Sequence, residues 1–261
     1  MQTFHEQALE GQHIVISGGL GALGLAVVKG LVDHGARMTI NDLLEERDAS
    51  ERLAAAGVRR DRVAYLKGDM TDEGEVVAFI AHARDRFGPV HTALCHVGMV
   101  LSAPLIEVTG EAWDRVMAVN VKTAFLLAKT AANAMIADQV AGHLLFTISW
   151  VAETPWPDIG AYNTSKAAMR QLMRSFAREL AARRIRANAI APGIAEVGMA
   201  KRQWDTEPDY RARVSKAIPL GYMQPPASIV DAFLFMCSAA ASYMTGSVLL
   251  VDGGCSLYPM D

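Results

Sequence analysis

Short apolar runs rich in β-branched residues alternate along the whole chain with longer segments of helical period. The runs lie at residues 13–18, 37–42, 63–69, 92–98, 143–149, 185–193 and 247–254. Apolar runs of strand length, separated by amphipathic segments, are typical of parallel strands buried between two layers of helices. The alternation therefore predicts the α/β class, with one doubly wound parallel sheet of seven strands and helices on both faces.

The chain is expected to form a single domain over residues 1–261. Its 261 residues are 51% hydrophobic, which is enough for one sizeable core, and they contain no repeat, low-complexity tract or linker. Amphipathic segments at 22–34 and 73–87 are followed by Gly35 and Gly88, residues of the kind that end helices. The mixed charges of residues 43–62 indicate a solvated helix face.

Charge and composition exclude several classes of protein. A formal net charge of −3 leaves no basic excess to meet nucleic acid. Residues 1–12 lack the features of a signal peptide, and no later segment has the ~18 uninterrupted apolar residues of a membrane span, so we expect a cytoplasmic protein without membrane association. The three cysteines and seven histidines show no ligand spacing, so no metal site is predicted.

A glycine-rich loop, within "ISGGLGALGLAVV" at residues 16–28, lies between the first predicted strand and the first predicted helix. In this position glycines let the backbone approach a pyrophosphate, and the start of the helix supplies N–H groups. The glycines fit more than one spacing. We take Gly18 and Gly24 as fixed anchors and Gly21 as the point of closest approach, which predicts a Rossmann-type dinucleotide site.

Asp42 ends the second predicted strand. A carboxylate at this point would accept hydrogen bonds from the adenosine ribose hydroxyls and repel a 2′-phosphate. No arginine or lysine stands beside Asp42 in the sequence. The residue therefore predicts NAD (NADH) as the cofactor in preference to NADP, with a turn-forming residue after a strand as the alternative reading.

Tyr162 and Lys166, in "YNTSK", are four residues apart in a segment of helical period. That spacing places both side chains on one face of a helix. A phenolate base at neutral pH requires the tyrosine pKa to fall by about three from ~10, equivalent to about 4 kcal/mol. A lysine cation and a positive nicotinamide ring both have the sign that lowers this pKa.

These motifs, in this order, resemble those of the short-chain dehydrogenase/reductases over about residues 11–254. The matching positions are the loop at 17–24, Asp42, Asn120, Ser149, Tyr162 with Lys166, Pro192 with Gly193, and the ending at 245–254. That ending resembles the ending of the compact members of the family. The chain also has no room for the large carboxy-terminal domain of the extended members.

The resemblance implies reversible hydride transfer between a secondary alcohol or ketone and a nicotinamide cofactor. It implies that Tyr162 is the general acid/base, that Lys166 lowers its pKa and binds the nicotinamide ribose, that Ser149 positions the substrate oxygen, and that Asn120 helps to hold a water. The residues it implies for cofactor binding are Ser17, Gly18, Gly21, Leu23, Gly24, Asp42, Leu43, Asp69, Met70, His96, Gly98, Tyr162, Lys166, Pro192, Gly193 and Ile194.

Two positions depart from the family pattern. The sequence "CHVG" at 95–98 stands where the family commonly has NNAG, and we expect His96 to act as a structural hydrogen-bond donor rather than as a titrating group. Val197 stands where a threonine often bonds the nicotinamide amide. The backbone of Ile194 could still orient that amide, so weaker cofactor affinity is expected.

The substrate is expected to be a hydrophobic or ring-bearing alcohol or ketone. Residues 193–226, with four prolines, are predicted to be an irregular stretch that serves as a substrate lid. The predicted pocket residues are mostly apolar or aromatic, although Trp150 and Trp204 could equally serve lid packing or a subunit interface. They are Met99, Trp150, Val151, Glu153, Trp156, Met199 and Trp204.

Two other functions remain as alternatives. A 3-oxoacyl reductase is disfavoured by Asp42 and by the absence of a marked basic patch, and a non-catalytic NAD-binding sensor or scaffold is disfavoured by the intact set of Asn120, Ser149, Tyr162 and Lys166. The family resemblance also implies a homotetramer or homodimer, with the ending at 255–261 able to reach a neighbouring subunit.

Overall fold

The centre of the molecule is one parallel sheet, formed by the apolar runs of the sequence. A computed structural model describes residues 4–257, so part of the ending at 255–261 lies outside the described residues. The strands follow the spatial order β3-β2-β1-β4-β5-β6-β7, which confirms the predicted doubly wound sheet. They are β1 (His13–Ser17), β2 (Arg37–Asp42), β3 (Val63–Lys67), β4 (Thr92–Cys95), β5 (His143–Thr147), β6 (Arg186–Pro192) and β7 (Val248–Val251).

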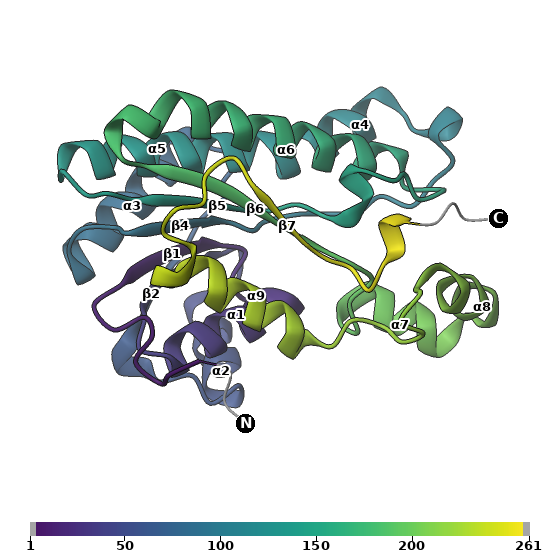
Figure 1. The fold of residues 1–261 in the computed structure, drawn as a ribbon, viewed down its shortest axis with the longest axis horizontal. Helices are drawn as coiled ribbons and strands as arrows, with labels where there is room; N and C mark the ends of the chain where they lie inside the picture. Colours follow the sequence, from purple (N-terminus) through teal and green to yellow (C-terminus); the bar gives the residue numbers. More distant parts are fainter. Residues whose placement is uncertain (1–3, 258–261) are drawn as a thin grey trace.

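Helices cover both faces of this sheet (Figure 1). One face carries α1 (Ala22–Asp33), α2 (Glu46–Ala55) and α9 (Pro226–Cys237), and the other carries α3 (Glu73–Phe87), α4 (Gly110–Met117), α5 (Thr123–Ala137) and α6 (Gly160–Leu180). Each layer of helices packs on the sheet through its own hydrophobic cluster. Phe233 is among the largest fully buried side chains of the first cluster, and Phe79 is among those of the second. Burial on both faces explains why the strands are apolar along their whole length.

Short helical turns connect several of these elements. They are η1 (Arg60–Arg62), η2 (Leu105–Glu107), η3 (Ala118–Lys122), η4 (Trp150–Ala152), η5 (Ala181–Arg183), η6 (Ala239–Ala241) and η7 (Cys255–Leu257). Of these, η3 is a single turn of π-helix, a form found often at functional sites.

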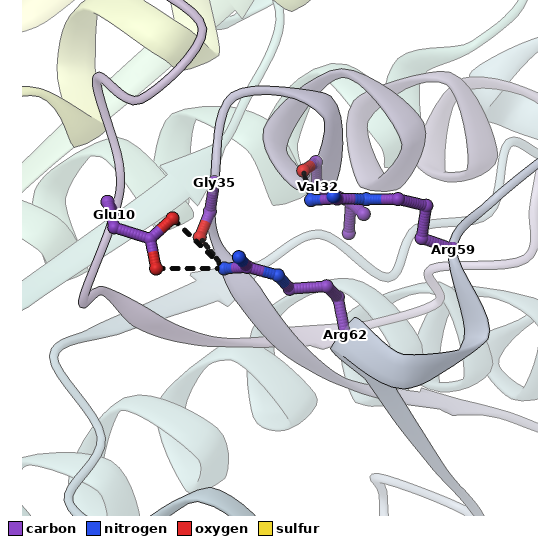
Figure 2. A network of polar contacts seen from close by, with 5 residues as sticks. All are labelled: Glu10, Val32, Gly35, Arg59 and Arg62. Carbon is purple, nitrogen blue, oxygen red and sulfur yellow. Dashed lines mark hydrogen bonds and ion pairs between the residues drawn. The ribbon is translucent and has the colours of Figure 1, made fainter.

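The charged run at 43–62 contributes α2 and then two arginines that close the turn after α1 (Figure 2). Arg59 Nη2 donates to the carbonyl oxygen of Val32 at 3.2 Å. Arg62 Nη1 donates to the carbonyl oxygen of Gly35 at 2.8 Å and to the carboxylate of Glu10 at 3.1 Å. The Val32 carbonyl also accepts from the backbone N–H of Gly35 at 3.1 Å, so Arg59 adds a second bond to the turn, and Arg62 holds Glu10, in the segment before β1, against it.

Residues 193–226 differ from the sequence prediction, because they are not irregular. They contain α7 (Gly198–Thr206) and α8 (Pro208–Ala217). Pro208 stands at the start of α8, where its missing N–H has no helical partner to lose, and Pro226 starts α9 in the same way. Two of the four prolines that suggested a loop therefore begin helices. Figure 1 shows α7 and α8 beside the end of the sheet, outside its two layers.

The two ends of the segment that carries α7 and α8 meet directly after β6. There, Gln224 donates its backbone N–H to Ile194 O at 2.8 Å and accepts from the backbone N–H of Glu196 at 2.8 Å. Its side-chain Oε1 accepts from the N–H of Gly193, also at 2.8 Å. Gln224 thus fastens both ends of the segment together directly after β6.

No helix among residues 4–257 is both long enough and apolar enough to cross a membrane. The same residues contain no group of three or more His, Cys, Asp or Glu side chains arranged to hold a metal ion.

Replacing Gly35 with alanine is expected to destabilise the fold. Gly35 has φ +100°, and a Cβ there would lie 3.0 Å from the backbone nitrogen of Glu10. Gly88 is the matched control, because its φ is +78° but a Cβ there would meet nothing within 4 Å. Gly88→Ala should lower the free energy of unfolding by about 1 kcal/mol, and Gly35→Ala by roughly 2 kcal/mol or more, as measured by urea denaturation. Equal losses in the two variants would contradict this account.

Candidate active site

Two adjoining cavities open where the strands end. One, of about 660 Å³, is lined by the glycine loop, Asp42 and Asp69, and we call it the glycine-loop cavity. The other, of about 330 Å³, is lined by Ser149, Tyr162 and Lys166, and we call it the tyrosine cavity. Leu23, His96 and Gly98 line both cavities. Ligands that occupied the two would therefore lie in contact with each other.

The glycine loop shows which of its spacings faces the cavity. Gly18, Gly21 and Gly24 line the glycine-loop cavity. Gly18 has φ +69°, and a Cβ on Gly24 would collide with the carbonyl oxygen of Gly18. Gly19 faces the core instead, since a Cβ there would lie 2.8 Å from the Ile40 side chain. The loop therefore closes tightly beneath the cavity and leaves backbone facing it.

The start of α1 faces the same cavity with its N–H groups unshielded. Among the described residues, no side chain caps this helix at Gly21 and no acidic residue lies in its first turn. Unpaired N–H groups and the positive end of the helix dipole make such a terminus suited to an anion. The loop and helix together fit the pyrophosphate of a dinucleotide.

Asp42 holds its carboxylate at the edge of the glycine-loop cavity. Its Oδ2 accepts from the backbone N–H of Leu20 at 3.1 Å, and its Oδ1 accepts from that of Leu43 at 2.8 Å. Two cations that the sequence did not associate with Asp42 are nearby. Arg52 donates to the carbonyl oxygen of Leu20 at 3.1 Å, and Arg115 of α4 lines the same cavity.

Lys166 lies buried beneath Tyr162 on α6. Its Nζ lies 5.5 Å from the centre of the Tyr162 ring and donates to the backbone carbonyl of Thr147 at 2.8 Å. A Cβ on Gly98 would lie 3.3 Å from this Nζ, so a glycine at that position leaves the lysine uncovered toward the cavities. Burial lowers the pKa of Lys166 to about 8.

Tyr162 does not show the fall in pKa that the sequence suggested. Burial raises the pKa of Tyr162 to about 12, although a hydrogen bond with the Ser149 side chain acts in the opposite direction. The loss of water around the phenol thus outweighs that bond. In this state of the protein Tyr162 is a proton donor at neutral pH.

Asn120 braces the site without lining either cavity. It lies fully buried in the π-turn η3, where its Oδ1 accepts from the backbone N–H of Met99 at 2.8 Å. Its Nδ2 donates to Met99 O at 3.0 Å and to Ser165 Oγ at 2.8 Å. The side chain therefore joins the loop after β4 to α6, and its expected role in holding a water remains a prediction.

Comparison with known proteins places this geometry in a family. A family model described as enoyl-(acyl carrier protein) reductase matches residues 18–256, which is most of the chain. The chain belongs to the short-chain dehydrogenase/reductase family. The protein is an oxidoreductase of secondary alcohols and ketones, and its family uses nicotinamide cofactors.

Individual relatives cover nearly the whole chain. The sequence is 31% identical over 252 residues to 3β-hydroxysteroid dehydrogenase 1 of Eggerthella lenta, across 96% of each chain. It is 32% identical over 255 residues to short-chain dehydrogenase reductase 5 of Arabidopsis thaliana, also across 96% of each. Among solved structures, a gluconate 5-dehydrogenase from Burkholderia cenocepacia in complex with NADP and tartrate aligns with a TM-score of 0.88 at 27% identity, over 97% of this chain and 99% of that one.

The cofactor residues suggested by the family resemblance gather around the two cavities, with one exception. Ser17 lines neither of them. It is buried, and its Oγ accepts from the backbone N–H groups of His96 at 3.2 Å and Val97 at 3.3 Å. Ser17 is the last residue of β1, directly before the glycine loop, and it braces the loop after β4.

His96, where the chain departs from the family pattern, contacts the side chain of Thr147. Its Nδ1 lies 2.9 Å from Oγ1 of Thr147. The backbone carbonyl of the same threonine accepts the hydrogen bond from Lys166 Nζ. Burial, assisted by the charge of Lys166, lowers the pKa of His96 to about 4. The imidazole is therefore neutral at pH 7. Because His96 lines both cavities, it lies close to where substrate and cofactor would meet. The family resemblance implied a place beside the cofactor, but the sequence did not place His96 beside the substrate.

The predicted substrate residues divide into two groups. Four of them line the tyrosine cavity: Trp150, Val151, Trp156 and Met199. Val197, which stands where the family often has a threonine, lines it too. Trp150 and Trp156 pack edge to face with their ring centres 5.5 Å apart.

The other three predicted substrate residues do not line the tyrosine cavity, each for a different reason. Met99 has its backbone held on Asn120, and it is the next residue, Val100, that faces the cavity. Glu153 forms an ion pair with Arg170 of α6. Trp204 packs against the hydrophobic cluster beneath α7, so Gln203 takes the cavity position on that helix.

Sequence reasoning missed the polar part of the tyrosine cavity. The missed residues come from the segment before α6, the loop after β4, and α7 with α8; they include Ser102, Asp158, Gln203, Tyr210 and Arg213. Reading Pro208 as a helix start would have placed Tyr210 and Arg213 on one face of a helix.

The buried His96 predicts a pH-dependent stability that a variant can remove. The folded-state pKa of about 4 lies below the unfolded value of 6.5, so the unfolded chain binds more protons between these values and acid destabilises the fold. Lowering the pH from 7.5 to 5 should therefore cost wild type about 2 kcal/mol at this one residue. His96→Asn should lose about 2 kcal/mol less than wild type over this interval, measured by denaturation at both pH values. An identical loss in both proteins would show that His96 titrates normally in the folded state.

Proposed function

We propose that the protein is an NAD-dependent oxidoreductase that interconverts a secondary alcohol and a ketone of a hydrophobic or ring-bearing substrate. The observation that carries this proposal is the common lining of one cavity by Ser149, Tyr162 and Lys166, next to a second cavity that fits a dinucleotide. The substrate's reacting carbon would lie in the first cavity, beside the nicotinamide end of the cofactor in the second.

The described residues fit a nicotinamide dinucleotide along the strand ends. The loop at 18–24 and the start of α1 would hold the pyrophosphate, and Asp42 would hold the adenosine ribose. Asp69 and Met70 would lie beside the adenine, and residues 192–194 beside the nicotinamide. When bound, the nicotinamide ring accepts or donates the hydride.

The chain's own residues would move the proton. Ser149 donates a hydrogen bond that positions the substrate oxygen. In the reductive direction Tyr162 donates its phenolic proton to that oxygen as the new C–H bond forms, and in the oxidative direction the phenolate removes the hydroxyl proton. The Lys166 cation stabilises the phenolate, whose formation burial would otherwise oppose. Asn120 keeps the loop after β4 in place.

The preference for NAD over NADP rests on the charge of Asp42. A dianionic 2′-phosphate beside this carboxylate would be repelled. Arg52 and Arg115 lie close enough to the region to lessen that repulsion, and the Burkholderia cenocepacia relative is described in complex with NADP. We propose NAD because Asp42 itself lines the glycine-loop cavity at the end of β2, where the adenosine ribose would lie.

The substrate preference rests on the lining of the tyrosine cavity. Trp150, Val151, Trp156 and Met199 provide apolar and aromatic surface. The relatives differ in the substrates in their names, a hydroxysteroid in one case and gluconate in another. A 3-oxoacyl reductase remains the second candidate, and the homotetramer or homodimer expected from the sequence remains a prediction.

Asp42 provides the test of cofactor choice. Wild type should bind NADH at least about tenfold more tightly than NADPH, and Asp42→Ala should reduce this preference to within about threefold, because one charge repulsion and two ribose hydrogen bonds are lost. Fluorescence titration with both cofactors measures this. Asp69→Asn is the matched control and should change both affinities alike. Equal binding of the two cofactors by wild type would refute the NAD assignment.

Tyr162 provides the test of catalysis. Tyr162→Phe removes the only proton carried by the proposed acid/base, so kcat should fall by about 10²–10⁴-fold while NADH affinity stays within about twofold. Stopped-flow reduction of a ring-bearing ketone and NADH titration measure the two effects. Unchanged turnover would exclude this mechanism, and unchanged biological function would favour the sensor or scaffold alternative.

A further inference from the structure

A cation faces the tyrosine cavity from the side of the lid. Apart from Lys166, Arg213 of α8 is the only lysine or arginine among the described residues that line this cavity. The mechanism above makes no use of Arg213. The Arg213 side chain is 44% exposed, so water solvates its charge at the edge of the cavity and the charge is present there without a buried partner.

Arg213 is held by aromatic rings. Its Cζ lies 5.4 Å from the ring centre of Trp156 and 5.9 Å from that of Tyr210. Trp156 is itself only 7% exposed, so its ring offers a fixed surface. Contact with ring faces restrains a guanidinium while leaving its N–H donors free.

Those donors have no hydrogen-bond partner among residues 4–257. Among the described residues, the only carboxylate within 4 Å of Arg213 is that of Asp158, at 3.9 Å from Nη1, which is beyond hydrogen-bond range. Arg211, on the same helix, is different: it donates to the carbonyls of Trp204 at 2.8 Å and Asp205 at 3.1 Å. Arg211 is engaged in structure, whereas Arg213 is restrained and available.

Asp158 is a weak competitor for this guanidinium. The two side chains are 44% and 50% exposed, and ion pairs at such exposure contribute little. Asp158 also lines the cavity, and its carboxylate disfavours a second multiply charged group nearby. A ligand carboxylate that reached Arg213 with two hydrogen bonds would bind it better than Asp158 does.

We propose that Arg213 anchors a carboxylate on the substrate. The substrate class would be an oxo or hydroxy carboxylic acid with an apolar, ring-bearing body, its carboxylate on Arg213 and its carbonyl or hydroxyl group at Ser149 and Tyr162. This inference rests on the proposed function. A carboxylate fits better than a phosphate, because a single guanidinium matches one carboxylate and the Asp158 charge opposes a dianion.

The anchor would also decide which carbon reacts. With the carboxylate held on α8, the length of the apolar body determines which carbon reaches Tyr162. Arg213 would therefore act as a specificity residue that contributes to substrate binding and to regioselectivity, and it would not take part in proton transfer.

Paired ketones test the proposal. We would measure kcat/KM with NADH for 4-oxocyclohexanecarboxylate against its carboxamide, and for 4-acetylbenzoate against 4-acetylbenzamide. In wild type at least one acid should be preferred over its amide by about tenfold or more, the expected value of hydrogen bonds to a charged group. Arg213→Gln should abolish the preference, mainly through KM for the acid. Asp158→Asn should increase it, because the competing carboxylate is gone.

A matched control comes from the same helix. Lys216 is exposed on α8 and lies outside the tyrosine cavity, so Lys216→Gln removes one positive charge without touching the site. This variant should keep the acid preference of wild type. A similar loss in both variants would show that the general charge of the lid, and not Arg213, attracts the acids, and would overturn the proposal.

A binding measurement separates this proposal from the proposed function. Tryptophan fluorescence of the NADH complex, titrated with benzoate and benzamide, should show benzoate binding more tightly in wild type and not in Arg213→Gln. If ketones are reduced but acids and amides are equivalent in both assays, the anchor is wrong and the proposed function stands. If no ketone is reduced while benzoate still binds through Arg213, the anchor stands and the proposed function fails.

Discussion

The reversal of strand order between β1 and β4 is the constraint on which the rest of the structure depends. The chain leaves β1 toward one face of the sheet, through α1, and leaves β4 toward the other, so the two loops diverge and a crevice opens between them. Four parts of the site lie at the carboxyl ends of strands that border this crevice or pair with those strands. They are the glycine loop, Asp42, His96 and Ser149.

Buried polar side chains keep the crevice in shape. Ser17 bonds the loop after β4 from the side of β1, and Asn120 bonds the same loop from the side of α6. Thr147 adds a third link, because its hydroxyl meets His96 and its carbonyl receives Lys166. Ser17, Asn120 and Thr147 are each at most 6% exposed, so water competes little for these bonds.

The sequence predicted what short-range rules control. Strand positions follow from burial on both faces, the ends of α1 and α3 follow from Gly35 and Gly88, and the shared face of Tyr162 and Lys166 follows from helix geometry. These features depend on neighbours within a few residues. The catalytic set was recognised because its members resemble a known family in both type and order.

The features that could not be predicted depend on partners distant in the chain. Glu153 is withdrawn from the cavity by Arg170, and Ser17 by the loop after β4. The raised pKa of Tyr162 comes from how much protein surrounds its phenol, which no spacing reveals. Arg213 reaches the cavity only because α7 and α8 turn it back toward Trp156.

The fastening at Gln224 has a consequence for how enzymes of this design can diversify. The backbone of residues 196–223 bonds the framework at Gln224 and at Leu220, whose N–H donates to Gly253 O at 3.2 Å. Changes within α7 and α8 can therefore reshape the tyrosine cavity while the strands and the glycine-loop cavity keep their own bonds.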